Sequence, residues 1–475
     1  TQALASQNFT SSTDTHNTAV GFEAGNAVTT GVQNTIVGSQ AGDALTDADL
    51  NVAVGYQALS ADTKGSRNIA IGYSALFSQN FTSSTNSFNT AVGDSAGQQV
   101  TTGTLNTFIG GLSGDATTTG QFNTAVGYNS LTSNTTASFN CAIGMESLRE
   151  NTTGTNNTSV GGYQTLIVNT TGSNNTAVGR TALSANTTAD NNTAVGFESL
   201  KVNTTGHENT ASGRRSMVSN TTGSDNTGFG NAALFSSTTA SANTAVGSGV
   251  ALSITTGAGN VAVGHDAMNG TDDGEFNVAI GKAALSANCG DGNTAVGKQA
   301  LTACTGGSNT ALGLVAGLGV TSGSNNILLG FNAGRSGSPG GNITTGSNIV
   351  GIGGDGISAA HIQVDWTVAS DQRDKTDFTA LDLGLDFVKA LAPVTYKWDK
   401  RSKYGDKTAD DYDLNAQSPD GTHKEDWLDI GFKAQEVEAL EQAAGYNKSN
   451  KTNLVSNHTG DGKQMGLQYS KFVPI

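Results

Sequence analysis

Cysteine, aromatic residues and long apolar runs are scarce in this chain of 475 residues. Three cysteines are too few for a disulfide scaffold. No run of 18 apolar residues occurs, so we expect no membrane insertion. Aromatic residues make up only 6% of the chain, which leaves one chain with few large side chains for a core.

Basic clusters and metal-ligand spacings are also missing. The formal net charge is -15, and the lysines and arginines are scattered. Because a protein that follows nucleic-acid phosphates needs a basic patch, we expect no nucleic-acid partner. The six histidines have no ligand spacing, and the glycine-rich stretch at 336–346 lacks the lysine of a phosphate-binding loop. The sequence predicts no metal and no other cofactor.

A short repeat dominates the sequence. The pentapeptide NTAVG, or a near copy, occurs twenty times, from Asn17 to a degenerate copy at Asn348. The spacing is 17 residues in most intervals, and it changes to 21 after Asn68, 18 after Asn157, and 16 after Asn277 and Asn293. A fixed short period indicates one coil of the chain per repeat.

The repeat predicts a narrow, flattened roll. Counting from the asparagine as position 1, seventeen residues at roughly 3.3 Å give about 56 Å of contour, enough for two short strands and their turns. The large apolar residues are Val or Ile at position 4 and Leu at position 9, and we expect both inside. Examples are Val20, Val126, Ile143, Val178 and Val195 at position 4, and Leu59, Leu148, Leu183, Leu200 and Leu285 at position 9.

Small residues occupy the other side of the expected strand. Position 3 is usually Ala and position 5 nearly always Gly, which permits close approach of another backbone. The glycine of the TTG element is expected to take positive φ in a turn between coils. This element ends at Gly154, Gly172, Gly206 and Gly223.

Stacked coils predict a mainly β, elongated β-solenoid shaft over residues 1–347. At about 4.8 Å per coil, twenty coils form a rod of roughly 95 Å. A single column buries little surface, so we expect a parallel homotrimer with the Ala/Gly faces inward. The segment SQNFTSST occurs at 6–13 and again at 78–85, so the chain is expected to begin inside a repeat.

The three cysteines lie in the repeats. Cys141 takes the usual Thr position of its repeat and is interpreted as a packed, inert thiol. Cys289 and Cys304 fall in turns of adjacent coils, where a separation near ~5 Å would suit a bridge. The sequence leaves free thiols and a disulfide open.

The composition changes after about Gly356. All three Trp, three of the four Pro and 14 of the 24 Lys plus Arg lie in the last 115 residues. Apolar spacing predicts helices at 378–391 and from Lys433, and PVTYKW from Pro393 reads as a strand. We therefore expect a transition segment at 348–369 and a small α+β domain at 370–475.

Four motifs occur in order in this domain: SDQRDK from Ser370, ALAPVTYKW from Ala390, GFKAQEVE from Gly431 and LQYSKFVPI from Leu467. Together they resemble the intramolecular-chaperone autoprocessing domain of phage tail spikes, tail fibres and endosialidases. The resemblance implies that the domain trimerises, helps the shaft fold and then cuts itself off.

The resemblance also implies the residues that cut. The scissile bond would join Ala369 to Ser370, with Ser370 as nucleophile, Lys375 as its base, and Asp371 and Arg373 as fixed members of the motif. A serine hydroxyl needs a nearby base, and a lysine serves as one only when burial lowers its pKa, which assembly could supply. The alternative is that Ser370 caps a turn and Lys375 is solvated. Enzyme activity is thus at most that of a self-cleaving Ser/Lys peptidase.

The sequence predicts the distal part of a phage tail fibre, an extracellular virion component that adheres to a host receptor and contacts other tail proteins. One alternative is a trimeric adhesin of a bacterial surface, whose head domains resemble these AVG repeats. Another is a polysaccharide-degrading tail spike, which needs two carboxylates about 5–10 Å apart. Glu146 and Glu198 share a repeat position but lie three coils apart, about 14 Å.

Overall fold

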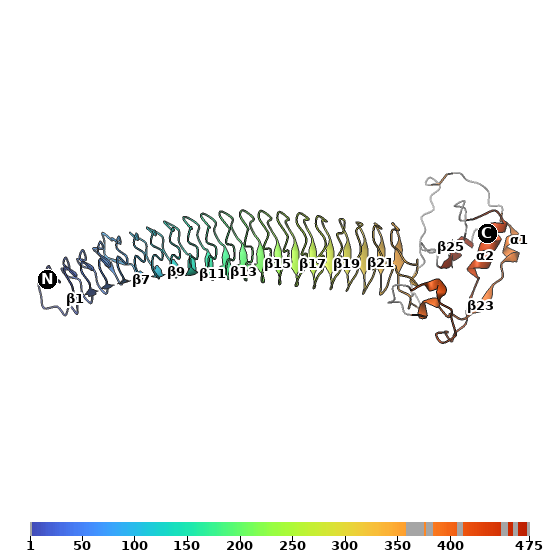
Figure 1. Cartoon of the computed structure of the whole chain (residues 1–475), viewed down its shortest axis with the longest axis horizontal. Helices are drawn as coiled ribbons and strands as arrows, with labels where there is room; N and C mark the ends of the chain where they lie inside the picture. The colour runs from blue at the N-terminus through green and yellow to red at the C-terminus, as the bar shows by residue number, and fades with distance from the viewer. Residues whose placement is uncertain are drawn as a thin grey trace. The chain divides into compact units, whose positions relative to one another are not determined.

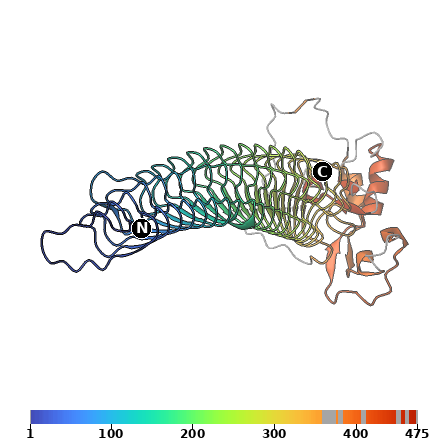
Figure 2. The same ribbon diagram turned by 60° about the vertical axis from the view of Figure 1, so that its left-hand side comes forward.

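The computed structural model describes residues 2–357, 375–376, 383–405, 412–447, 455–458 and 464–472. The chain divides into two compact units, Thr1–Asn277 and Val278–Ile475. The first is a stack of flat coils, which Figure 1 shows from the side and Figure 2 from nearer the stacking direction. The second begins with coils of the same kind and ends in a small α+β part. The expected mainly β solenoid followed by a small α+β domain is confirmed.

Each coil of the first unit contributes one short strand to a parallel sheet. Strands pair in register, as Thr176 of one coil with Thr193 of the next. The step widens to 21 residues between Ile69 and Thr90, as the sequence spacing predicts. The strands are β1 (Thr18–Val20), β2 (Thr35–Val37), β3 (Val52–Val54), β5 (Ile69–Ile71), β7 (Thr90–Val92), β8 (Thr107–Ile109), β9 (Thr124–Val126), β10 (Cys141–Met145), β11 (Thr158–Tyr163), β12 (Thr176–Val178), β13 (Thr193–Val195), β14 (Thr210–Ser212), β15 (Thr227–Phe229), β16 (Thr244–Val246) and β17 (Val261–Val263). Two shorter strands, β4 (Gly65–Ser66) and β6 (Thr85–Asn86), pair separately.

The interior of each coil is filled by the middle residue of the strand and by the residue at position 9. Ala194 and Leu200 are both 0% exposed, so the expected burial of position 9 is confirmed. The expected burial of position 4 is wrong, because Val195 is 38% and Val20 59% exposed. Neighbouring residues of a strand point to opposite faces, and in this coil the alanine takes the inner one.

The width of the coil explains why alanine faces inward. A leucine from position 9 reaches across the interior and leaves room for little more than a methyl group opposite. Where the middle residue is large, position 9 is glycine instead, as with Ile36 and Gly42 or Phe108 and Gly114. A Cβ on Gly114 would lie 2.4 Å from the Phe108 ring. The inner volume therefore permits one large side chain per coil at these two positions.

The side of the coil opposite the strand is built from turns. Glu198 and Leu200, at positions 7 and 9, have left-handed φ values of 56° and 47°. The expectation of two strands per repeat is therefore wrong. The glycine of the TTG element does not have the positive φ that we expect. Gly206 is needed for space instead, since a Cβ there would lie 2.3 Å from the carbonyl oxygen of Gly223 in the next coil.

Asparagine at position 1 forms a buried ladder along the sheet. The Asn192 backbone N–H donates to Oδ1 of Asn175 at 3.0 Å, and the Asn192 Nδ2 donates to the Gly206 carbonyl at 2.9 Å. Its Oδ1 accepts from the Asn209 N–H at 3.1 Å. Asn192 is 0% exposed, so water does not reach its side chain. The hydrogen bonds within the protein therefore satisfy its amide oxygen and its amide nitrogen. The sequence analysis used this asparagine only to mark the repeat.

Glycine at position 5 lets successive coils approach closely. Gly196 has a φ of +132°, and a Cβ on it would lie 2.5 Å from the carbonyl oxygen of Gly213. The close approach expected at this position is confirmed. The approaching backbone is that of the next coil of the same chain.

The second unit opens with five parallel strands of the same type. They are β18 (Val278–Ile280), β19 (Thr294–Val296), β20 (Thr310–Leu312), β21 (Ile327–Leu329) and β22 (Val350–Ile352), the last within the 348–369 segment. Cys289 and Cys304 are buried among these coils and are not joined in a disulfide. Burial raises the pKa of Cys304 to about 11.

The α+β part contains two helices and two antiparallel strand pairs among its described residues. The expected helix at 378–391 appears as α1, the strand from Pro393 as β23 and the helix from Lys433 as α2. Among the residues that the structure describes, no helix is long and apolar enough to cross a membrane. The elements are α1 (Leu385–Ala390), β23 (Val394–Tyr396) paired with β24 (Asp429–Gly431), α2 (Ala434–Ala443), β25 (Ser456–His458) paired with β26 (Met465–Leu467), and the 3-10 helices η2 (Arg401–Lys403), η3 (Leu414–Ala416) and η4 (Tyr469–Phe472).

Candidate functional site

The residues predicted to cut the chain fall mostly outside the described residues. Ala369, Ser370, Asp371 and Arg373 are not among them. Lys375 is described and is exposed. The geometry of the proposed nucleophile and base is therefore not part of the structure, and the pairing of Ser370 with Lys375 stays a prediction.

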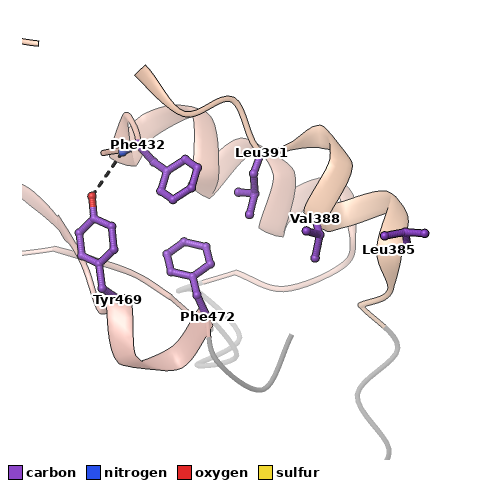
Figure 3. A pocket seen from close by; sticks show the side chains of 6 residues that line it. All are labelled: Leu385, Val388, Leu391, Phe432, Tyr469 and Phe472. Carbon is purple, nitrogen blue, oxygen red and sulfur yellow. Dashed lines mark hydrogen bonds between the residues drawn. The ribbon is translucent and has the colours of Figure 1, made fainter. Parts of the chain in front are cut away.

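An apolar cavity lies beside helix α1. Leu385, Val388 and Leu391 follow one another at three-residue spacing, which places them on one side of the helix. Figure 3 shows Leu391 and Val388 on the side of the Phe432 and Phe472 rings, and Leu385 at the end of the helix away from them. Together with Tyr469 these residues line a space of about 480 Å³.

The aromatic wall of this cavity is held in place by its own contacts. The Phe432 and Phe472 ring centroids are 5.3 Å apart, and those of Tyr469 and Phe472 are 5.9 Å apart. The Phe432 backbone N–H donates to the Tyr469 hydroxyl at 3.3 Å, the dashed line in Figure 3. These contacts join η4 to the segment between β24 and α2.

Large apolar side chains of this cavity and of the segment around β24 reach the solvent. Leu385 is 65% and Tyr469 is 52% exposed, and Ile430 of β24 is 78% exposed. Trp427 and Leu428, which precede β24, are exposed as well. A small domain with so much exposed apolar surface is suited to bind another protein surface.

A buried carboxylate joins α2 to β25. Glu441 is 1% exposed. One oxygen accepts hydrogen bonds from the backbone N–H groups of Val455 and Ser456, and the other accepts from the Ser456 hydroxyl. One helical turn earlier, Glu438 lies 2.8 Å from Nε2 of His458. The sequence analysis missed Glu441, although its place four residues after the buried Val437 signals an inward-facing position.

We expect Glu441→Gln to weaken the contact between α2 and β25. The amide nitrogen that replaces one oxygen cannot accept a hydrogen bond, so one buried donor of residues 455–456 is left without its partner. The free energy of local opening should fall by about 1–3 kcal/mol. Hydrogen exchange of the β25 amides measures this, with the exposed Gln442→Ala on the same helix as control. Equal exchange in both variants would contradict the role assigned to Glu441.

The shaft carboxylates considered for polysaccharide cleavage are held by basic side chains. Glu146 lies 3.1 Å from Arg149. Glu198 lies 2.9 Å from Lys201 and 2.8 Å from Arg215. Hydrogen bonds from these two bases lower the pKa of Glu198. A glycosidase acid needs a raised pKa, so the surroundings of Glu198 do not favour that role.

Comparison with known proteins identifies the C-terminal part of the chain. No curated protein and no solved structure gives a significant match. The family model described as chaperone of endosialidase matches residues 370–446. This range begins at Ser370 and contains three of the four motifs, together with α1 and α2. The expected resemblance is confirmed: the chain carries at its C-terminus a domain that matches the chaperone of endosialidase family, preceded by a β-solenoid shaft.

Proposed function

We propose that this chain is the distal part of a phage tail fibre, a virion protein whose shaft contacts the host surface. The observation that carries the proposal is the match to a chaperone of endosialidase that starts at Ser370, after a β-solenoid of twenty strands. A long repetitive shaft folds slowly as a single chain, and a C-terminal chaperone meets that need. The receptor belongs to the host surface, and other tail proteins hold the fibre.

The chaperone brings three chains together in this proposal. The exposed apolar side chains around the α1 cavity, above all Leu385 and Tyr469, support association with other chains. Once three shafts have folded side by side, a high unfolding barrier keeps them together without the chaperone. The chaperone is then dispensable.

Release follows by self-cleavage between Ala369 and Ser370. The Ser370 hydroxyl attacks the Ala369 carbonyl carbon and gives its proton to Lys375. The carbon–nitrogen bond breaks, and the freed Ser370 amine takes the proton back. Water then hydrolyses the ester between the two residues. Neighbouring chains bury the exposed lysine, which favours its neutral, basic form.

Mass spectrometry of the freshly expressed chain tests the cleavage. We expect the native chain to give two products, residues 1–369 and 370–475. Ser370→Ala should leave one product of 475 residues. Ser418→Ala, an exposed serine of the same domain, serves as control and should be cut like the native chain. One full-length product from the native chain, unchanged in Ser370→Ala, would refute cleavage but leave the chaperone role intact.

A further inference from the structure

The outer face of the shaft sheet carries no charge. In each of the fifteen sheet strands of the first unit, the second residue points inward and the first and third residues point outward. These outward residues are Thr, Val, Ile, Ser, Phe or Cys throughout. The five sheet strands of the second unit also carry no charged residue. We call these outward side chains the outer sheet face.

The repeat tolerates charged residues close to the outer sheet face. The position two residues after the strand is exposed and carries Asp94, Arg180 and Arg214 in different coils. In a chain with a net charge of -15, a continuous uncharged strip beside such a position points to a surface that packs against another chain in the assembled protein.

The outer sheet face is uncharged, with Thr beside Val, Ile or Phe in most strands, and it is partly open in the single chain. Ile109 is 40% exposed and Phe229 is 58% exposed, whereas the middle alanines are 0% exposed. A parallel sheet normally has both faces covered, and here the coil covers only one. Fifteen strands at about 4.8 Å and a strip roughly 10 Å wide give about 700 Å², close to the ~800 Å² that each partner contributes to a stable interface.

A partner for this face must itself be long, uncharged and repetitive. Other copies of the same chain meet these conditions, because their outer sheet faces have the same length and the same spacing. Copies that fold from a common C-terminal chaperone start from one end and run parallel, so equal coils meet at equal heights. No charge is then buried, and the acidic side chains stay at the solvent side.

We infer that the outer sheet faces of three chains meet along the common axis of the shaft. The inference rests on the trimer of the proposed function and names the surface that forms it. It replaces the expected arrangement with the Ala/Gly faces inward, because the position 3 alanines fill the core of their own coil. The turns on the opposite side of each coil are then left for host contact.

Cys141 provides a native probe of this arrangement. It is the first residue of β10, on the outer sheet face, and is a half-buried free thiol. In the inferred trimer, the Cys141 side chains of three chains lie close to one axis. Cys289 and Cys304 are less accessible to a reagent, because both are buried; burial raises the pKa of Cys141 and raises that of Cys304 to about 11.

The experiment uses the full chain with Ser370→Ala, so that every chain keeps its 475 residues. A short bismaleimide should join chains through Cys141 and give a covalent dimer on denaturing gels. Cys141→Ser should abolish the dimer, and Thr193→Cys on the same face should restore it. Cys141→Ser with Thr205→Cys, on an exposed turn, should give none.

A charge on the face gives a second test. Val246→Lys should lower the mass in solution from three times 48.0 kDa to one chain, whereas Ser248→Lys, two residues further on, should leave the trimer intact. If Val246→Lys does not fold, the Cys141 and Thr193→Cys cross-links alone test whether the outer sheet face forms the interface. A trimer without the Cys141 and Thr193→Cys cross-links would overturn the assigned face but not the proposed function. A monomeric native chain would overturn both.

Discussion

Replacing Asn192 with leucine should lower the free energy of unfolding around its coil by about 2–6 kcal/mol. The substitution removes the donor to the Gly206 carbonyl and the acceptor for the Asn209 N–H, both in a fully buried place. Each buried group that loses its partner costs about 1–3 kcal/mol. The similar size of leucine does not compensate, because the lost contacts are polar.

Hydrogen exchange of the full chain measures this effect at the coil itself. The amides of β13 and β14 should exchange at least about 30-fold faster, because 1.4 kcal/mol corresponds to a factor of ten. Asn231→Leu makes the same replacement at an exposed position two residues after β15, and should change exchange little. If both variants exchange alike, the ladder does not stabilise the shaft.

The stacking of the coils and the register of their strands could be predicted from the period of the repeat. The spacing of the asparagines sets the strand register, including the longer step between Ile69 and Thr90. Leucine at position 9 is buried as expected, because no other residue of the repeat fills a narrow interior as well. The C-terminal elements α1, β23 and α2 follow from ordinary apolar spacing.

The alternation of side chains along the strand did not predict which of its residues face the core. A strand with Thr, Ala and Val places its middle residue opposite the other two, but the pattern does not say which side is the core. The choice depends on the coil's width, which the left-handed residues at positions 7 and 9 set, such as Glu198 and Leu200. These are not residues that signal positive φ, so the sequence gives no warning of them.

The sequence yields a prediction for the site only where a motif marks it, and the roles of the motif residues stay a prediction. The SDQRDK motif points to Ser370 and Lys375, and the family match begins at the same serine. The contacts of Glu441 with Ser456 and of Phe432 with Phe472 join segments far apart in the chain. Such contacts have no local periodicity, so single-sequence reasoning cannot find the partners.

Replacing Gly196 with alanine should lower the free energy of unfolding of its part of the shaft by about 2–6 kcal/mol. A φ of +132° is a conformation that only glycine adopts readily, and forcing another residue into it costs about 1–3 kcal/mol. The new methyl group also meets the Gly213 carbonyl oxygen at 2.5 Å, so two coils must separate, at a further cost of about 1–3 kcal/mol.

Gly162→Ala is the matched control for this substitution. Gly162 lies in β11, is exposed, and a Cβ on it would meet nothing within 4 Å. Thermal unfolding of the two variants should therefore differ clearly, with Gly162→Ala close to the native chain. Because most coils repeat the contact between position 5 and the next carbonyl, a tolerated Gly196→Ala would mean that the spacing of the coils is set elsewhere. The turns of the TTG element would then be the next candidate, since Gly206 meets the Gly223 carbonyl oxygen in the same way.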